Sequence, residues 1–448
     1  MRTIAILLLV LVIVAPQSHA QESSHALLSP SRRLSAYTAT GFLPRYFVSV
    51  ANVNPQLNLN FTVGQLLVGD PSINVRNLVT SRLYLGASSE TDVDVVSLLW
   101  KNRKGHRTGV GFKVTASVLA QLDRDFLRIA TEGILPSGFG EEVVESKGVT
   151  VNAHVFSEWY VHKVRTLGRT NFGYRVRLVT PLAGAQITTP EFQLARINNG
   201  TSNELSLSYA FASAYYGFDP QNPSAISITP SRLFSKNTSL MFDLGIEQEV
   251  SSKLRIGLAA QALPGTLRFD GANQTTVSGS IRYEGPQFEL GKDSLSAVFS
   301  ELVNFNLDSL LPTVTNNPQA QIQIPIRPTF RIYGHRYLSE ESMLSLALTS
   351  RPSPYRNDLW TSAYVYARPN KLFHVAYGLN WWTNNNTVEA SVSGRLLLLP
   401  YTRLTLGMSN PFLLPRIAPS GAVLVPENFS GFTLSVGLSF GLYRDESL

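Results

Sequence analysis

A possible nucleophile motif lies near the C-terminus, where Gly437-Leu438-Ser439-Phe440-Gly441 matches the G-x-S-x-G pattern of serine hydrolases. That motif works only when a sharp turn between a strand and a helix exposes the serine hydroxyl. Here it lies inside a regular alternation of apolar and small residues, which predicts a straight strand with no helix after it. The absence of cysteine also excludes thiolate nucleophiles and iron–sulfur clusters. We therefore expect no catalytic residue, and an enzyme is the weakest interpretation.

Three candidate metal ligands, His154, Glu158 and His162, follow one another at intervals of four residues. Along a strand this interval separates neighbouring side chains by about 13 Å, too far for one metal ion bound at about 2 Å. The sequence contains no phosphate-binding loop, dinucleotide-binding fingerprint, EF-hand or zinc-protease motif. We predict no bound metal and no cofactor.

Charged side chains alternate with apolar neighbours, which places them on the opposite side of each strand from the apolar side chains. They are Lys113, Glu158, Arg175, Arg177, Glu204, Asp243, Glu247, Glu249, Arg255, Arg331, Glu389, Arg395 and Arg403. If that side lines the lumen of a closed sheet, the charges must be paired or hydrated. Two interpretations stay open: a polar network of ion pairs that braces the lumen, or a path for a solute.

The composition indicates a surface that is not entirely in water. Charged residues make up 15% of the 448 residues, against about 25% in soluble domains. The formal net charge is +7, and lysine and arginine are scattered singly rather than gathered into a basic stripe. Nucleic acid is therefore not an expected partner.

The first twenty residues have the pattern of a secretory signal peptide. Arg2 precedes a nearly unbroken apolar run from Ile4 to Ala15, and Ser18-His19-Ala20 forms a small-x-small cleavage site. We predict that residues 1–20 are removed and that residues 21–448 form a single domain. No later stretch has 18 consecutive apolar residues, so the mature chain is either soluble outside the inner membrane or crosses a membrane as strands.

The elements that must position these side chains are strands. The clearest alternation is in the last strand, where Phe432, Leu434, Val436, Leu438 and Phe440 share one side and small or polar residues share the other. We predict that these five side chains face lipid. Similar runs of about 9 to 14 residues recur along the chain, longer than the average strand and close to the 9 to 11 residues of a tilted membrane strand.

The predicted fold is all-β: a closed antiparallel transmembrane β-barrel of about 14 to 16 strands. Tight connections, such as those at Ser251-Ser252 and Pro369-Asn370, alternate with long ones, as expected when one rim of a barrel carries turns and the other carries loops. Residues 119–130 and 294–310 have apolar residues at helical spacing, which predicts two short helical plug or loop segments.

About a fifth of the chain, from Gly109 to Phe192, resembles a family of outer-membrane barrels of Bacteroidetes-type bacteria that is distantly similar to FadL and PorV. The resemblance depends on the order of the segments Gly109 to Phe112, Leu122 to Leu127, Thr131 to Gly133, Glu158 to Tyr160, Phe172 to Leu178 and Leu182 to Ile187. It implies a location in the bacterial outer membrane. Similarity to FadL implies the passage of hydrophobic compounds, and similarity to PorV implies service to a secretion machine.

The sequence thus predicts a non-enzymatic barrel that contacts the lipid bilayer, with two functional interpretations. The first is a passive transporter or conduit whose ligand is a hydrophobic small molecule. The second is a docking or structural barrel whose partner is a secretion-system or surface protein. Fold alone does not choose between them.

Overall fold

The computed structural model describes most of the chain as β-structure. The described residues are 46–59, 84–101, 106–125, 140–146, 148–198, 203–217, 237–263, 265–284, 313–326, 328–339, 342–352, 358–367, 373–383, 387–399, 402–409, 416–417, 423–424 and 431–442. They form one antiparallel sheet of 18 strands and a small pair, β18 (Arg416–Ile417) and β19 (Val423–Leu424). The predicted signal peptide lies outside the described residues.

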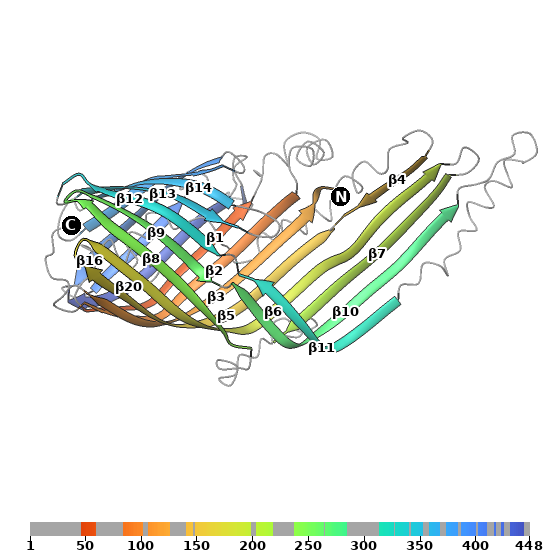
Figure 1. Cartoon of the computed structure of the whole chain (residues 1–448), viewed down its shortest axis with the longest axis horizontal. Coiled ribbons are helices and arrows are strands. Elements are labelled where there is room, and N and C mark those ends of the chain that lie inside the picture. Colours follow the sequence, from red (N-terminus) through yellow and green to blue (C-terminus); the bar gives the residue numbers. More distant parts are fainter. Residues whose placement is uncertain are drawn as a thin grey trace, which may run out of the picture.

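Fourteen strands of the large sheet follow one another in a ring of antiparallel pairings (Figure 1). In ring order they are β1 (Tyr46–Leu59), β2 (Tyr84–Lys101), β3 (Arg107–Asp123), β5 (Val149–Leu167), β6 (Thr170–Asn198), β8 (Ser239–Ser251), β9 (Leu254–Leu263), β12 (Thr329–Tyr337), β13 (Ser342–Arg351), β14 (Asp358–Ala367), β15 (Phe373–Trp382), β16 (Thr387–Leu399), β17 (Thr402–Ser409) and β20 (Gly431–Leu442). β20 pairs with both β17 and β1.

The other four strands build a sheet that projects beyond the ring, here called the extension. They are β4 (Gly140–Glu145), β7 (Asn203–Tyr216), β10 (Thr266–Glu284) and β11 (Thr313–Pro325). β6 is 29 residues long, and its second half leaves the ring to pair with β4 and β7. β7 pairs with β10, and β10 with β11, so the extension stands to one side of the ring in Figure 1.

The two ends of the ring differ. At one end, called the turn end, short connections join neighbouring strands: residues 168–169, 252–253, 338–341, 368–372 and 400–401. At the other, called the extension end, the chain between strands is longer or enters the extension, except at the short connections 352–357 and 383–386. The tight connections predicted at Ser251-Ser252 and Pro369-Asn370 are among the short ones. The predicted alternation of short and long connections holds from β1 to β9, but from β12 to β16 the connections at both ends have four to six residues.

Side chains alternate between an exposed outer face and a buried inner face. On β8, Leu240, Leu244 and Ile246 are exposed, whereas Asp243 and Glu247 are buried. The last strand follows the same pattern, because Leu434, Val436 and Phe440 are exposed and Leu438 is half-buried; nothing is described for the side chain of Phe432. The outer face is therefore apolar, although it is the exposed face.

Several glycines lie directly opposite an aromatic ring on the next strand. Gly257 pairs with Tyr333, and a methyl group added at Gly257 would overlap with the tyrosine ring. Gly111 faces Tyr160, and Gly378 faces Tyr364, in the same way. Glycine is needed at these positions because the ring occupies the space where a Cβ would stand.

Replacing Gly257 with alanine is therefore expected to lower the free energy of unfolding by about 1 to 3 kcal/mol, the usual effect of overpacking. A urea titration of the protein in detergent micelles, followed by tryptophan fluorescence, measures the change. Gly334→Ala on the adjoining strand is the control, since its added methyl group would meet only the Arg255 carbonyl oxygen at 3.7 Å. Equal stabilities of the two variants would contradict the packing argument.

The helical prediction for residues 119–130 is wrong over residues 119–123 and agrees with the structure at residues 124–125, which are helical. Residues 119–123 continue β3 rather than starting a helix, because their backbone pairs with β2 on one side and β5 on the other. Residues 126–130 and the second predicted helix, 294–310, lie outside the described residues. Among the described residues, no helix has the length and apolar character needed to cross a bilayer.

Candidate functional site

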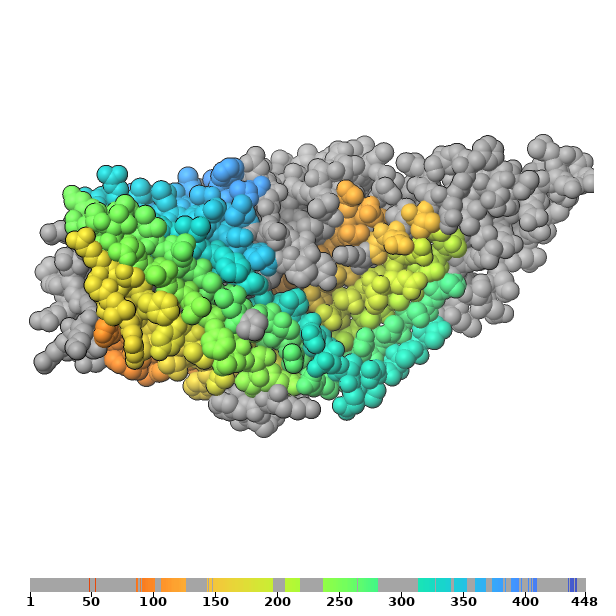
Figure 2. All heavy atoms as spheres, in the orientation of Figure 1, coloured from red at the N-terminus to blue at the C-terminus, as the bar shows by residue number. Residues whose placement is uncertain are grey.

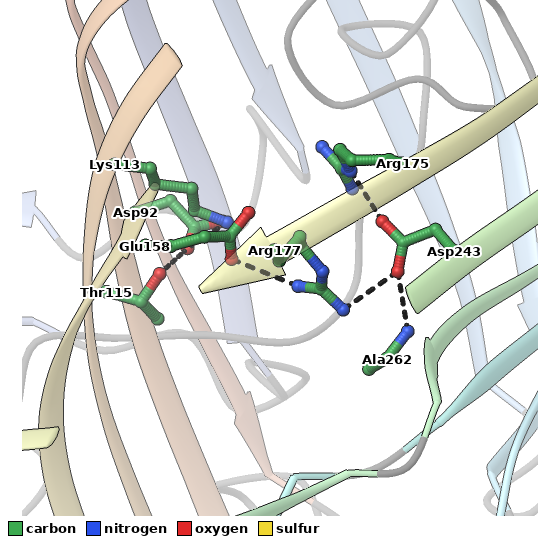
Figure 3. A network of polar contacts seen from close by, with 8 residues as sticks. All are labelled: Asp92, Lys113, Thr115, Glu158, Arg175, Arg177, Asp243 and Ala262. Carbon is green, nitrogen blue, oxygen red and sulfur yellow. Dashed lines mark hydrogen bonds and ion pairs between the residues drawn. The ribbon is translucent and has the colours of Figure 1, made fainter. Parts of the chain in front are cut away.

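The inner face carries a cluster of buried charges centred on Asp243 (Figure 3). The Asp243 carboxylate accepts a hydrogen bond from the guanidinium group of Arg175 and forms an ion pair with Arg177, with 2.8 Å between Arg177 Nη2 and Asp243 Oδ1. The backbone N–H of Ala262 also donates to Asp243 Oδ1, at 2.7 Å. One carboxylate therefore joins β6, β8 and β9.

The cluster continues across the neighbouring strands. Arg177 donates to Glu158 on β5 at 3.0 Å, and Glu158 lies directly opposite Lys113 of β3 in the strand register. The Lys113 ammonium group is 2.9 Å from Asp92 on β2, which also accepts a hydrogen bond from Thr115 at 2.7 Å. The six charged side chains Asp92, Lys113, Glu158, Arg177, Asp243 and Arg175 form what we call the charged belt. Its charges alternate in sign along five adjacent strands.

Local irregularities of the chain explain why Asp243 takes the central place. The pairing of β8 with β9 shifts register between Phe242 and Leu244, on either side of the aspartate. Ala262 has a positive φ of 59°, a backbone conformation that residues other than glycine seldom adopt. The hydrogen bond from Ala262 to Asp243 holds this turn, which leads the chain from the ring into β10 of the extension.

A second group of charges lies nearer the turn end. Glu247 is 3.8 Å from Arg255, which also donates to Glu249 at 3.4 Å. The Tyr333 hydroxyl donates to Glu247 at 3.4 Å. This group links β8, β9 and β12 in the same manner as the charged belt links β2 to β8.

Burial determines what these ion pairs do. Glu158 and Asp243 are almost completely buried, and the two arginines are nearly so. Such a network is stable only while every charge keeps its partner, because an uncompensated buried charge destabilises a fold strongly. The arrangement therefore joins strands that are far apart in sequence, and it fixes the turn from which the extension begins.

An apolar cluster covers the inner face at the extension end, where the extension meets the ring. It contains Phe156, Val179 and Met241 from the ring, with Leu267, Phe269, Ile322 and Ile324 from β10 and β11. Ala214 and Ala272 complete it, and Tyr216 packs its ring edge-on against Phe269 at 5.4 Å between centroids. We call this group the rim cluster. Its side chains are apolar although the inner face below them is charged.

Eight of the predicted charged residues fall into the two charged groups: Lys113, Glu158, Arg175, Arg177, Asp243, Glu247, Glu249 and Arg255. Glu204 is elsewhere, near the start of β7 in the extension and opposite Glu284. Arg395 pairs in register with His374, and Arg403 with Ser439; nothing is described for the side chains of Glu204, Arg395 and Arg403. Asp92 was not predicted as a site residue, although it alternates with the apolar Val93 and Val95 in the same way as the predicted charged residues alternate with their apolar neighbours.

The other chemical candidates show no reactive arrangement. Among the described residues, no group of three His, Asp or Glu side chains could hold a metal ion. Glu158 is engaged by Arg177, and His162 lies over Gly109 on the adjoining strand. Ser439 lies within β20, an uninterrupted strand rather than a turn between a strand and a helix.

Several solved structures are similar to this chain. They include the toluene transporter TbuX of Ralstonia pickettii (9% identity, 93% of this chain and 94% of that chain, TM-score 0.46) and the toluene transporter TodX of Pseudomonas putida (9%, 96% and 96%, 0.45). A FadL homologue of Pseudomonas aeruginosa is also similar (10%, 91% and 92%, 0.44). No curated protein matches the sequence. The model of a family of unknown function, DUF5723, matches residues 41–390, and the chain belongs to that family.

Proposed function

We propose that the chain is a bacterial outer-membrane protein, exported by a cleaved signal peptide, that forms a closed transmembrane β-barrel of fourteen strands. The ring of pairings supports closure, because every strand of the ring then has two neighbours and no edge is exposed to lipid. The exposed apolar outer face supports contact with acyl chains, since such a face in water would be an aggregation hazard.

Strand lengths and connections fit the same proposal. β13, β14 and β15 have ten residues each, within the range of about 9 to 11 that a tilted membrane strand needs. Outer-membrane barrels have short turns on the periplasmic side and longer connections outside the cell. The turn end is then periplasmic and the extension extracellular.

Within this barrel we propose passive transport of small hydrophobic molecules. The observation that supports this proposal is the rim cluster, a group of buried apolar side chains on the inner face at the extracellular end. A hydrophobic solute that enters among these side chains leaves water, which favours its binding there. The charged belt below alternates in sign, unlike the single-sign rings that select ions, so it favours no net charge in a solute.

Two measurements test the proposal. A detergent-extracted barrel should migrate differently on a gel before and after boiling. Proteoliposomes should then take up a small uncharged aromatic compound faster than a sugar of similar size, and Phe269→Asp, which puts a charge into the rim cluster, should reduce that difference. Unchanged mobility would reject the barrel. A barrel that admits sugar and aromatic compound equally would reject selective hydrophobic transport.

A second candidate function, docking of a secretion-system or surface protein in the manner suggested for PorV, is favoured by the extension. Its outer side carries a cross-strand row, Phe211, Val277 and Val314, that runs over β7, β10 and β11. Val314 is exposed, and Tyr209 lies beside Phe211 with 5.9 Å between ring centroids. If this side docks a protein, a photo-crosslinker at position 314 should capture that protein in living cells, and one at the exposed Val388 of the ring should not.

A further inference from the structure

A groove of about 490 Å³ crosses the outer face of the ring over β8, β9, β12 and β13. Phe172, Leu244, Ile246, Leu258, Phe330 and Ile332 form most of its walls. Figure 2 shows this face, with the green side chains of β8 and β9 beside the cyan side chains of β12 and β13. The volume falls within the range of about 300 to 1,000 Å³ that ligand pockets usually have.

The strand register explains the groove. One row across the strands alternates large and small side chains: Leu244, Ala260, Phe330, Ser350 and Leu359. The next row, Ile246, Leu258, Ile332 and Leu348, contains only large ones. Ala260 and Ser350 therefore leave depressions between their neighbours. The wall is also thin there, because Gly245 and Ala259 on the inner face are small as well.

On β9, β12 and β13 the groove lies toward the extension end, whereas its wall on β6, Phe172, lies close to the turn end. Phe330 is the second residue of β12, Ser350 is next to last in β13, and both are remote from the tight connection at 338–341. In the orientation proposed above, this places the part of the groove around Phe330 and Ser350 in the outer leaflet of the membrane. The exposed Arg268 is the third residue of β10, six residues after Ala262, and lies where the extension begins, beyond the apolar surface.

We propose that the groove binds one acyl chain of lipid A, the lipid anchor of lipopolysaccharide. This inference rests on the proposed membrane location and goes beyond the proposed transport. The groove is lined almost wholly by aliphatic and aromatic side chains, and at that depth the molecules that can fill it are acyl chains. The outer-leaflet position and the charge of Arg268, which complements the phosphates of lipid A, favour this lipid over a neutral one.

The experiment measures, by native mass spectrometry, how much purified diphosphoryl lipid A is retained in detergent by the folded wild-type protein and by two variants. Wild type should keep one lipid A under conditions that remove detergent. Ala260→Phe, which fills the depression between Leu244 and Phe330, should bind about tenfold more weakly, equivalent to about 1.4 kcal/mol. Val161→Phe, in a separate outer-face groove of about 430 Å³ formed with Leu98 and Val176, is the matched control and should bind as wild type does.

Two results would overturn the proposal: equal lipid A retention by wild type and Ala260→Phe, or equal retention of lipid A and phosphatidylglycerol by the wild type. Heat-dependent gel mobility is recorded for all three proteins. If the mobility shift is present and the lipid preference absent, only the groove proposal fails. If the shift is absent in the wild type, the barrel proposal fails with it.

Discussion

Replacing Asp243 with asparagine is expected to lower the free energy of unfolding by about 3 to 5 kcal/mol, the range found when one partner of a buried ion pair is removed. Asparagine has nearly the same shape and keeps an oxygen for the N–H of Ala262. It removes the negative charge that Arg175 and Arg177 share inside the fold. Arg177 would keep Glu158, and Arg175 would lose the charge of the carboxylate that accepts its hydrogen bond.

A urea titration in detergent micelles, with gel mobility recorded at each urea concentration, measures this loss. Glu249→Gln is the control, because Glu249 also pairs with an arginine on the inner side but is about one-third exposed. Exposed ion pairs contribute about 0 to 1 kcal/mol, so this variant should unfold at nearly the wild-type urea concentration. If both variants were equally stable, burial of Asp243 would not be what makes its pairing important.

Alternation along the strands explains what could be predicted from the sequence. A strand turns successive side chains to opposite sides, so Arg175 and Arg177 were expected on one side and Val176 on the other. The structure has that arrangement, and it also brings Asp243, 68 residues away from Arg175, into contact with both arginines. Which strands become neighbours depends on the whole ring, and alternation within one strand contains no information about its neighbour.

The extension could not be predicted for a different reason. Residues 313–319 form the first half of β11, yet all of them are exposed, so neither side carries the apolar pattern by which a strand is recognised. The same applies to β6, because the residues from Thr180 to Ala185, where β6 begins to leave the ring, are not apolar on one side only. Pairing with β5 and β7 keeps this segment extended, although its own residue pattern does not predict a strand.

Arginine at position 379 should destabilise the folded protein by about 2 to 4 kcal/mol if the outer face contacts lipid, since that is the effect of a cation at the middle of a bilayer. Leu379 lies on the outer face of β15 and is 52% exposed. In water the same substitution at so exposed a position would change stability by less than about 0.5 kcal/mol. The size of the effect therefore reports the surroundings of the outer face rather than its packing.

Leu338→Arg is the matched control, because Leu338 is also 52% exposed but lies in the tight connection between β12 and β13. Near the membrane interface the expected effect falls to about 0 to 1 kcal/mol. Both variants are refolded into lipid vesicles and titrated with urea. Because the two positions are equally exposed, the difference between the two losses of unfolding free energy reports the depth of each position in the membrane. A large loss at position 379 with little change at 338 is expected of a chain whose outer face spans a membrane. Small losses at both positions would mean that the exposed apolar face meets water or another protein, and the transport proposal would then lose its physical basis.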